Sequence, residues 1–185
     1  GGILAAKDLP AMGGDTMWCN QYLAYERLSD GMKAMLDGMK ARFCGARLAR
    51  AHGHAGDIPE YYHPVVRTHP ETGRKALFVG HPETCTNFQN MTVAESRPLL
   101  DYLYAHSTQP DAIYRHMWKP GDVLIFHALT LHGARGNRSA STKRRAITTR
   151  WCGEDVVYKP KGMPMPYETG LEPGERLGGR VFPRL

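Results

Sequence analysis

The sequence predicts a mainly β, single-domain protein with a few helices. Its 185 residues are enough for one domain with a sizeable core. Glycine (20 residues) and proline (13 residues) are too frequent for a helical bundle and suit short strands joined by turns. Several short apolar runs are bounded by turn residues, as strands are. We find neither an internal repeat nor a linker in the sequence, so residues 1–185 are interpreted as one domain.

Local signals place the expected elements along the chain. Ser29 is a good N-cap for a helix, and methionines and leucine follow at helical spacing. Thr92 and Glu95 stand at capping-box spacing and predict the start of a second helix. Residues 44–60 carry three glycines and a proline without periodicity, which predicts a loop. Strands are expected over residues 65–68, 76–79, 123–126 (buried) and 145–151, with a surface tail from Tyr158 onward.

The charge pattern favours an anion site over a nucleic-acid arm. The net charge is +6, and the densest basic run, residues 143–145, lies at an expected strand and not in a tail. A nucleic-acid partner is not expected, because aromatic residues are not interleaved with a basic stripe. The four cysteines form no CxxC pair, and no apolar run is long enough to span a membrane. We therefore expect a soluble, cytoplasmic protein with reduced thiols.

His132 is the first candidate for chemistry. A Pro-Gly-Asp turn at residues 120–122 leads into the apolar run 123–126, and His132 follows at the far end. Imidazole is a good Fe(II) ligand, and the end of a barrel strand can direct it into the barrel mouth. His127 competes for this role, and a strand-end histidine taken alone is more often structural.

Two arginines follow that histidine. Arg144 and Arg145 stand at the start of the strand expected over residues 145–151. A guanidinium binds a carboxylate through two parallel hydrogen bonds, so either could anchor a carboxylate-bearing co-substrate. Neighbouring strand residues point to opposite faces, and only one of the two can therefore face inward. Without the histidine, a solvent-facing basic pair would be the better interpretation.

Together these features resemble two families of Fe(II)- and 2-oxoglutarate-dependent oxygenases. Over residues 2–125 the chain resembles the taurine dioxygenase (TauD/TfdA) family. Over residues 126–160 it is similar to phytanoyl-CoA dioxygenase-like proteins. The matching segments are residues 13–18 (Gly-Gly-Asp-Thr-Met-Trp), 63–75, 95–100, 114–122, 126–139 and 144–151. The resemblance implies a double-stranded β-helix (jelly roll, cupin-like) fold.

The resemblance also implies roles for single residues. His132 matches the distal histidine of the facial iron triad. Thr16 matches a threonine that helps to bind 2-oxoglutarate, and Arg145, with Arg144 as second choice, matches the arginine that pairs with the distal carboxylate of 2-oxoglutarate. Arg150 matches a second arginine, near the substrate, with an offset of one residue. Where the taurine dioxygenase family usually has Trp-Asp-Asn-Arg, this chain has Phe-His-Ala-Leu at 126–129.

The other two iron ligands of these families form a His-x-Asp or His-x-Glu pair. His-x-Asp does not occur in this sequence, and the families carry the pair upstream of the Gly-Gly-Asp-Thr segment. Residues 69–71 and 81–83 have His-x-Glu spacing, but short motifs have high false-positive rates. We therefore expect this sequence to lack its N-terminal part.

The expected function is a dioxygenase that hydroxylates a small, anionic organic substrate. Its cofactors would be Fe(II) and 2-oxoglutarate, and its partners the substrate and O₂, with no nucleic acid and no membrane. The tendency of the family toward oligomers makes a homo-oligomer one expectation. The alternative is a non-catalytic relative of the fold or a truncated anion-binding module.

Overall fold

The computed structural model describes residues 1–51, 53, 55–127, 130–134, 136, 139, 141–160 and 168–182. Its strands are β1 (Gly2–Asp8), β2 (Thr16–Cys19), β3 (Lys40–Cys44), β4 (Glu60–Pro64), β5 (Val66–Thr68), β6 (Lys75–Leu77), β7 (Cys85–Phe88), β8 (Ile113–His116), β9 (Val123–Phe126), β10 (His132–Gly133) and β11 (Arg145–Arg150). Its helices are α1 (Gln21–Glu26), α2 (Asp30–Leu36), α3 (Ala46–Ala51), α4 (Val93–Ser107) and the 3₁₀ turn η1 (Pro110–Ala112). The mainly β composition is as predicted.

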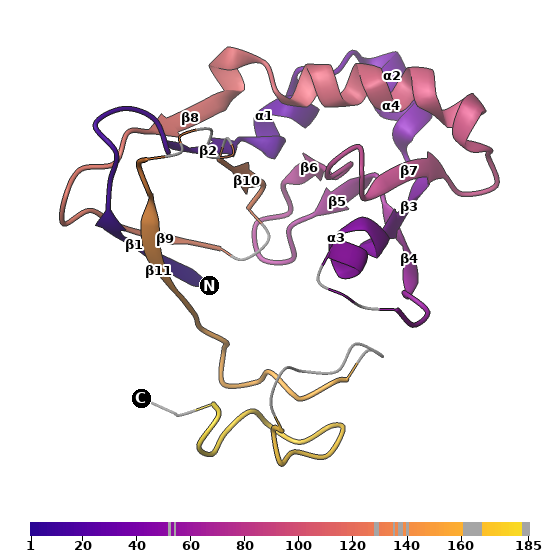
Figure 1. Cartoon of the computed structure of the whole chain (residues 1–185). Coiled ribbons are helices and arrows are strands. Elements are labelled where there is room, and N and C mark those ends of the chain that lie inside the picture. Colours follow the sequence, from indigo (N-terminus) through magenta and orange to yellow (C-terminus); the bar gives the residue numbers. More distant parts are fainter. Residues whose placement is uncertain are drawn as a thin grey trace.

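Two three-stranded antiparallel sheets lie together in one half of the molecule (Figure 1). Their strand orders are β11-β1-β9 and β10-β2-β8. The rings of Trp18 in β2 and Phe126 in β9 lie 5.9 Å apart and join the two sheets. Neighbouring strands in both sheets are distant in sequence, as in a jelly roll, where the chain crosses between sheets.

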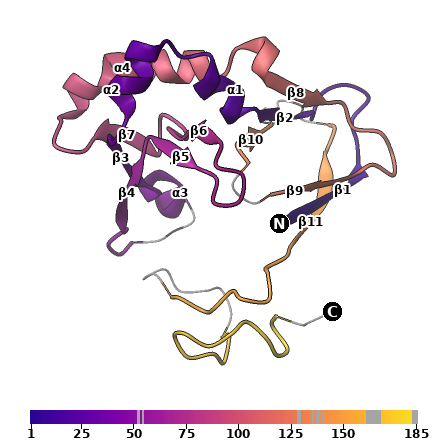
Figure 2. The same ribbon diagram turned by 180° about the vertical axis from the view of Figure 1, so that it is seen from behind.

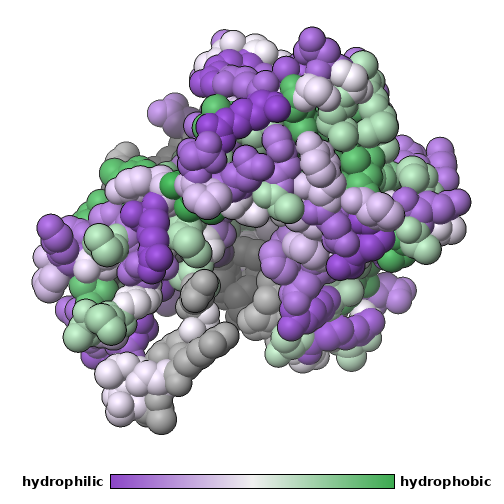
Figure 3. Space-filling view, turned by 90° about the horizontal axis from the view of Figure 1, so that it is seen from above, coloured by the Kyte–Doolittle hydropathy of each residue, from purple (hydrophilic) through white to green (hydrophobic). Residues whose placement is uncertain are grey.

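The hydrophobic core lies in the other half, between helices and a third sheet. Helices α1, α2 and α4 run along one side of the molecule, and the sheet β4-β3-β7 and the hairpin β5-β6 lie against them (Figures 1 and 2). Fully buried side chains there include Leu36, Leu77, Phe88, Leu100 and Leu103. Hydrophilic side chains dominate the outer face of the helices (Figure 3).

Capping explains where the two helices predicted from the sequence begin. The Ser29 hydroxyl accepts from the Met32 N–H, and α2 begins at the next residue, Asp30. Thr92 and Glu95 form the complete capping box before α4. Both helix starts are confirmed.

Three expectations were wrong. Residues 44–60 are not all loop, because α3 occupies part of them. The strand at residues 123–126 forms, but it is not buried: Val123 is 56% and Ile125 is 76% exposed. His132 does not end that strand; it begins the separate strand β10 in the other sheet.

The chain leaves the sheets after β11. The described residues of the tail make one isolated bridge, between Val157 and Arg176, and otherwise run away from the two sheets (Figure 2). Residues 161–167 of the expected tail lie outside the described residues. Among the helices that the structure describes, none is long and apolar enough to cross a membrane.

Candidate functional site

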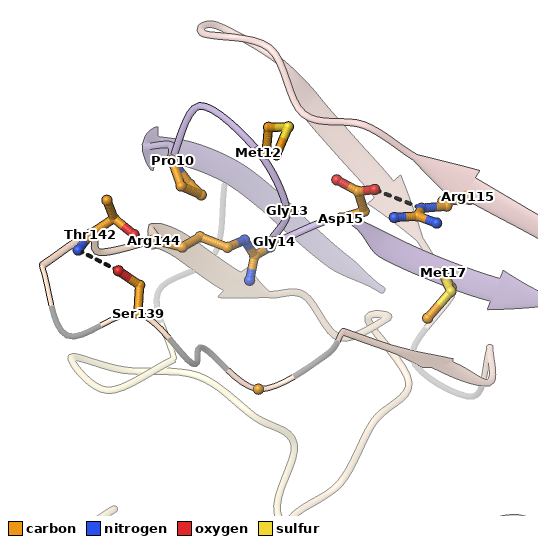
Figure 4. Close-up of a pocket in the computed structure, with 11 residues that line it drawn as sticks. Pro10, Met12, Gly13, Gly14, Asp15, Met17, Arg115, Ser139, Thr142 and Arg144 are labelled. Atoms are coloured by element: carbon orange, nitrogen blue, oxygen red, sulfur yellow. Dashed lines mark hydrogen bonds and ion pairs between the residues drawn. The ribbon is translucent and has the colours of Figure 1, made fainter.

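The Gly-Gly turn before β2 makes room for an arginine. Gly13 and Gly14 have φ values of +86° and +76°, a conformation that favours glycine. A Cβ added to Gly14 would lie 2.8 Å from the Cδ atom of Arg144. The bare backbone of Gly14 therefore lets the stem of Arg144 pass across the turn, as the close-up in Figure 4 shows.

Thr16 receives the end of that arginine. Its side chain is buried, and its Oγ1 accepts from Nη2 of Arg144 at 3.3 Å and from Nε1 of Trp118 at 3.0 Å. The guanidinium carbon of Arg144 lies 5.7 Å from the centre of the Trp118 ring. These contacts gather Thr16, Trp118 and Arg144 into one polar cluster, called here the donor cluster.

Of the three buried side-chain donors that have no acceptor within the described part of the chain, two belong to Arg144 and to strand β2. They are Nε of Arg144, which belongs to the donor cluster, and Nε1 of Trp18. A buried donor without a partner costs free energy, on the order of 1–3 kcal/mol. Acceptor-rich anions, carboxylates above all, satisfy such donors. The donor cluster therefore fits one carboxylate of 2-oxoglutarate.

His132 lies on the same face as Thr16. It pairs with Trp18 across the β10–β2 ladder, and Trp18 is two residues from Thr16, so all three side chains share one face of this sheet. The imidazole Nδ1 lies 2.8 Å from the Thr130 carbonyl oxygen. A carbonyl can only accept, so Nδ1 carries the proton, and the lone pair of Nε2 is available to a metal.

Phe126 connects the His132 side with the second sheet. Its ring centre lies 4.8 Å from that of His132. In the sheet β11-β1-β9, Gly2 pairs with both Phe126 and Arg150. Directly paired residues share a face, so Arg150 belongs to the face that carries Phe126.

The structure separates the two neighbouring arginines. Arg144 precedes β11 and contacts Thr16, whereas Arg145 is the first residue of β11 and pairs with Asp8 opposite it. The side chain of Arg145 is 69% exposed. Of the two arginines that the sequence put forward, the structure brings the second choice, Arg144, to Thr16.

The comparisons with known proteins agree with this geometry. The model of the family described as taurine catabolism dioxygenase TauD, TfdA family matches residues 1–151. The chain belongs to this family. An alpha-ketoglutarate-dependent 2,4-dichlorophenoxyacetate dioxygenase from Burkholderia sp. (strain RASC) is 36% identical over 153 residues, which are 78% of this chain and 50% of the relative. The enzyme of the same name from Cupriavidus pinatubonensis is 34% identical over 163 residues, which are 84% of this chain and 55% of the relative.

Solved structures of similar proteins support the jelly-roll fold. AAD-2 in complex with Mn(II) and N-oxalylglycine has a TM-score of 0.68 and 26% identity, over 80% of this chain and 60% of that one. A taurine dioxygenase from Burkholderia xenovorans has a TM-score of 0.57 and 35% identity, over 66% of this chain and 40% of that one. The TauD-family chain described here thus spans about half the length of the curated relatives that it matches.

The two His-x-Glu segments of this TauD-family chain stabilise turns. His69 Nδ1 accepts from the backbone N–H groups of Glu71 and Thr72, and His81 Nδ1 accepts from that of Glu83. Glu83 is also ion-paired with Arg47. Within the described residues, no group of three or more His, Cys, Asp and Glu side chains could hold a metal. The described residues therefore do not complete an iron site around His132.

A large cavity borders the donor cluster but lies on the other side of the sheet. It has a volume of about 1010 Å³, and Arg144 is the member of the donor cluster that lines it. Met17 and Arg115 also line the cavity and are paired with each other. Because Met17 directly follows Thr16 in β2, this pair lies on the face of the sheet opposite to the Thr16 side chain. Asp15 accepts from Nε of Arg115 at 2.6 Å at its edge (Figure 4). We therefore place the chemistry at the donor cluster and not in this cavity.

Sequence reasoning missed the residues behind Thr16. Trp118 donates to Thr16, and the ring of His116 packs edge-on against Trp118 with ring centres 4.7 Å apart. Asp122 lies 2.9 Å from Nε2 of His116 and accepts from the Lys119 N–H. That N–H and His116 lower the pKa of the Asp122 carboxyl. All of them lie in the matched segment 114–122, but the sequence gives no sign of their pairing with β2.

Proposed function

We propose that this chain is the co-substrate-binding part of an Fe(II)- and 2-oxoglutarate-dependent dioxygenase that hydroxylates a small anionic organic molecule. One observation carries the proposal: a buried hydroxyl and an arginine with an unsatisfied N–H converge on the face that holds His132. Enzymes of the TauD family use this cofactor pair. The complete reaction converts R–H, 2-oxoglutarate and O₂ into R–OH, succinate and CO₂.

The residues of this chain would bind and orient the co-substrate. 2-Oxoglutarate supplies two electrons when it loses CO₂ and becomes succinate. Arg144 neutralises the distal carboxylate, and Thr16 donates a hydrogen bond to it. The rings of Trp18 and Phe126, which lie beside His132, would keep that side of the site apolar.

His132 would contribute its Nε2 lone pair to iron. Among the described residues no group of three or more His, Cys, Asp and Glu side chains could hold the ion, so we derive no step through the metal. Imidazole suits Fe(II), and the bond from Nδ1 to Thr130 orients the ring.

Arg150 would bind the substrate anion. Its register places it on the face of Phe126, and Phe126 contacts His132. Relatives named for 2,4-dichlorophenoxyacetate and for sulfate esters suggest organic anions with an apolar body. A guanidinium on the face that also carries an aromatic ring matches that chemistry.

A second candidate function is an anion-binding module without catalysis. It is favoured because, among the described residues, no group of three or more His, Cys, Asp and Glu side chains could hold a metal. Both functions require the donor cluster, so carboxylate binding tests what they share, and release of CO₂ from 2-oxoglutarate separates them.

The test is calorimetric titration of the 185-residue chain with 2-oxoglutarate. We expect Arg144→Ala to weaken binding by roughly 2–5 kcal/mol if the carboxylate is buried against it. Arg145→Ala is the matched control, because Arg145 is exposed and paired with Asp8. Equal affinity of the wild-type and Arg144→Ala chains would contradict the proposal, and a loss in Arg145→Ala alone would restore the first choice of the sequence analysis.

A further inference from the structure

The hydrogen bonds at Thr16 fix the direction in which its hydroxyl can act. A threonine hydroxyl has two acceptor lone pairs and one O–H donor. In this structure Nε1 of Trp118 and Nη2 of Arg144 both donate to Oγ1. Neither partner can accept in return, because an indole N–H and a guanidinium only donate. The Thr16 O–H therefore remains for a group outside this cluster, and that group must be an acceptor.

We infer that Trp118 is a positioning residue that commits the Thr16 hydroxyl to donating to the co-substrate carboxylate. The inference rests on the proposed function of the site and adds a residue to it. With the indole N–H in place, one lone pair of Thr16 is always used. Without it, the freed lone pair could accept from water and the hydroxyl could turn among several orientations, and the ligand would have to restore the productive one at a cost in affinity.

The surroundings of Trp118 hold its ring still. The His116 ring packs edge-on against the Trp118 ring, and the guanidinium of Arg144 lies over the Trp118 ring. His116 is itself fixed by Asp122 on Nε2 and by the Tyr114 hydroxyl, 3.3 Å from Nδ1. Asp122 is tied to the turn through the Lys119 N–H. A ring held on several sides presents its N–H in one direction, as a positioning role requires.

The experiment is an NMR titration of the ¹⁵N-labelled chain with glutarate. Glutarate carries two carboxylates and no keto group, so it reports carboxylate binding and requires no metal. The variants are Trp118→Phe, which keeps a ring and removes the N–H, Thr16→Val, and the double variant. Trp151→Phe is the matched control, because Trp151 also donates its indole N–H to a threonine, Thr149, at 2.9 Å, outside the donor cluster.

We expect Trp118→Phe to weaken glutarate binding by about three- to tenfold, the value of one hydrogen bond. It should cause no further loss in the Thr16→Val background, because the two residues act as one unit. Trp151→Phe should bind as the wild type does. In Thr16→Val, the indole N–H signal of Trp118 should move and exchange faster with solvent, whereas the signal of Trp151 should stay.

Each other outcome has a definite meaning. If Thr16→Val weakens binding but Trp118→Phe does not, or if the two losses simply add, the inference is wrong and the proposed function stands. If wild type binds no glutarate, or Thr16→Val binds it equally well, the proposed function itself fails. Should Trp118→Phe not fold, the Trp118 indole signal in Thr16→Val still decides, and an unmoved signal would overturn the inference.

Discussion

Gly14 shows how a single hydrogen atom in place of a side chain can shape this site. A Cβ at Gly14 would lie 2.8 Å from Cδ of Arg144, whereas a Cβ at Gly13 meets no heavy atom within 4 Å. Both glycines have positive φ, so an alanine at either position costs about 1 kcal/mol or more of stability. The difference between the two positions therefore isolates the contact with Arg144 from backbone strain.

We predict that Gly14→Ala weakens 2-oxoglutarate binding by about tenfold or more, because the stem of Arg144 must move away from Thr16. Gly13→Ala should lose a similar amount of stability and keep its affinity for 2-oxoglutarate. Calorimetric titration measures the affinities, and chemical denaturation measures the stabilities. Equal affinity in the two variants would show that Arg144 does not need the bare backbone of Gly14.

The choice between Arg144 and Arg145 could not be made from the sequence. Strand alternation showed that only one of them can face inward, but not which one. The answer depends on where β11 begins and on its register with β1, which shifts between Ala6 and Asp8. Both are long-range properties. His132 and Thr16 could be proposed as site residues from the sequence alone, because their motifs are local.

At the scale of elements, α4 is the helix whose start the sequence predicted most directly. The Thr92 hydroxyl accepts from the Glu95 N–H, and the Glu95 carboxylate accepts from the Thr92 N–H. We predict that Thr92→Ala lowers the free energy of unfolding by about 1 kcal/mol. Val93→Ala, at an exposed neighbouring position, should change it much less. Equal effects in urea denaturation would argue against the capping box.

The same capping box predicts a pH dependence. The backbone N–H and the hydroxyl of Thr92 lower the pKa of Glu95 in the folded chain. A lowered folded pKa means that this stabilisation is complete above the ordinary glutamate pKa and is lost as the pH falls through the lowered value. The stability difference between wild type and Glu95→Gln should therefore shrink on acidification. A constant difference across that range would exclude this linkage.

Elements without local signals were predicted less well. The helix α3 has helix-forming Ala and Arg residues, but the glycines around it predicted a loop instead. The strand β10 has only two residues, and it exists because it pairs with β2, more than a hundred residues earlier in the chain. Pairing of this kind is set by tertiary contacts and not by propensity.

At the scale of the whole molecule, burial was the property that the sequence predicted least reliably. The apolar run 123–126 predicted a buried strand, yet Val123, Ile125 and Ile147 expose more than half of their surface on one face of the sheet β11-β1-β9. A hydrophobic run indicates that a strand can be buried, but the strand is buried only where another part of the protein packs against its face. The described residues do not cover this face, and the chain spans about half the length of its curated relatives.

Metal binding also belongs to the whole molecule, because the three ligands of a facial iron site come from distant parts of a chain. We predict that the 185-residue chain binds Mn(II), as a redox-stable substitute for Fe(II), only weakly, and that His132→Ala removes this binding. One imidazole cannot hold a divalent ion as three ligands with a carboxylate can. Electron paramagnetic resonance of free Mn(II) measures the affinity.

His81→Ala is the control, because the His81 imidazole accepts a hydrogen bond within a turn and lies in no metal-binding group among the described residues. Tight binding that survives His132→Ala would contradict the prediction, and single alanine variants of His127, His81 and Glu83 would then show which side chains hold the ion.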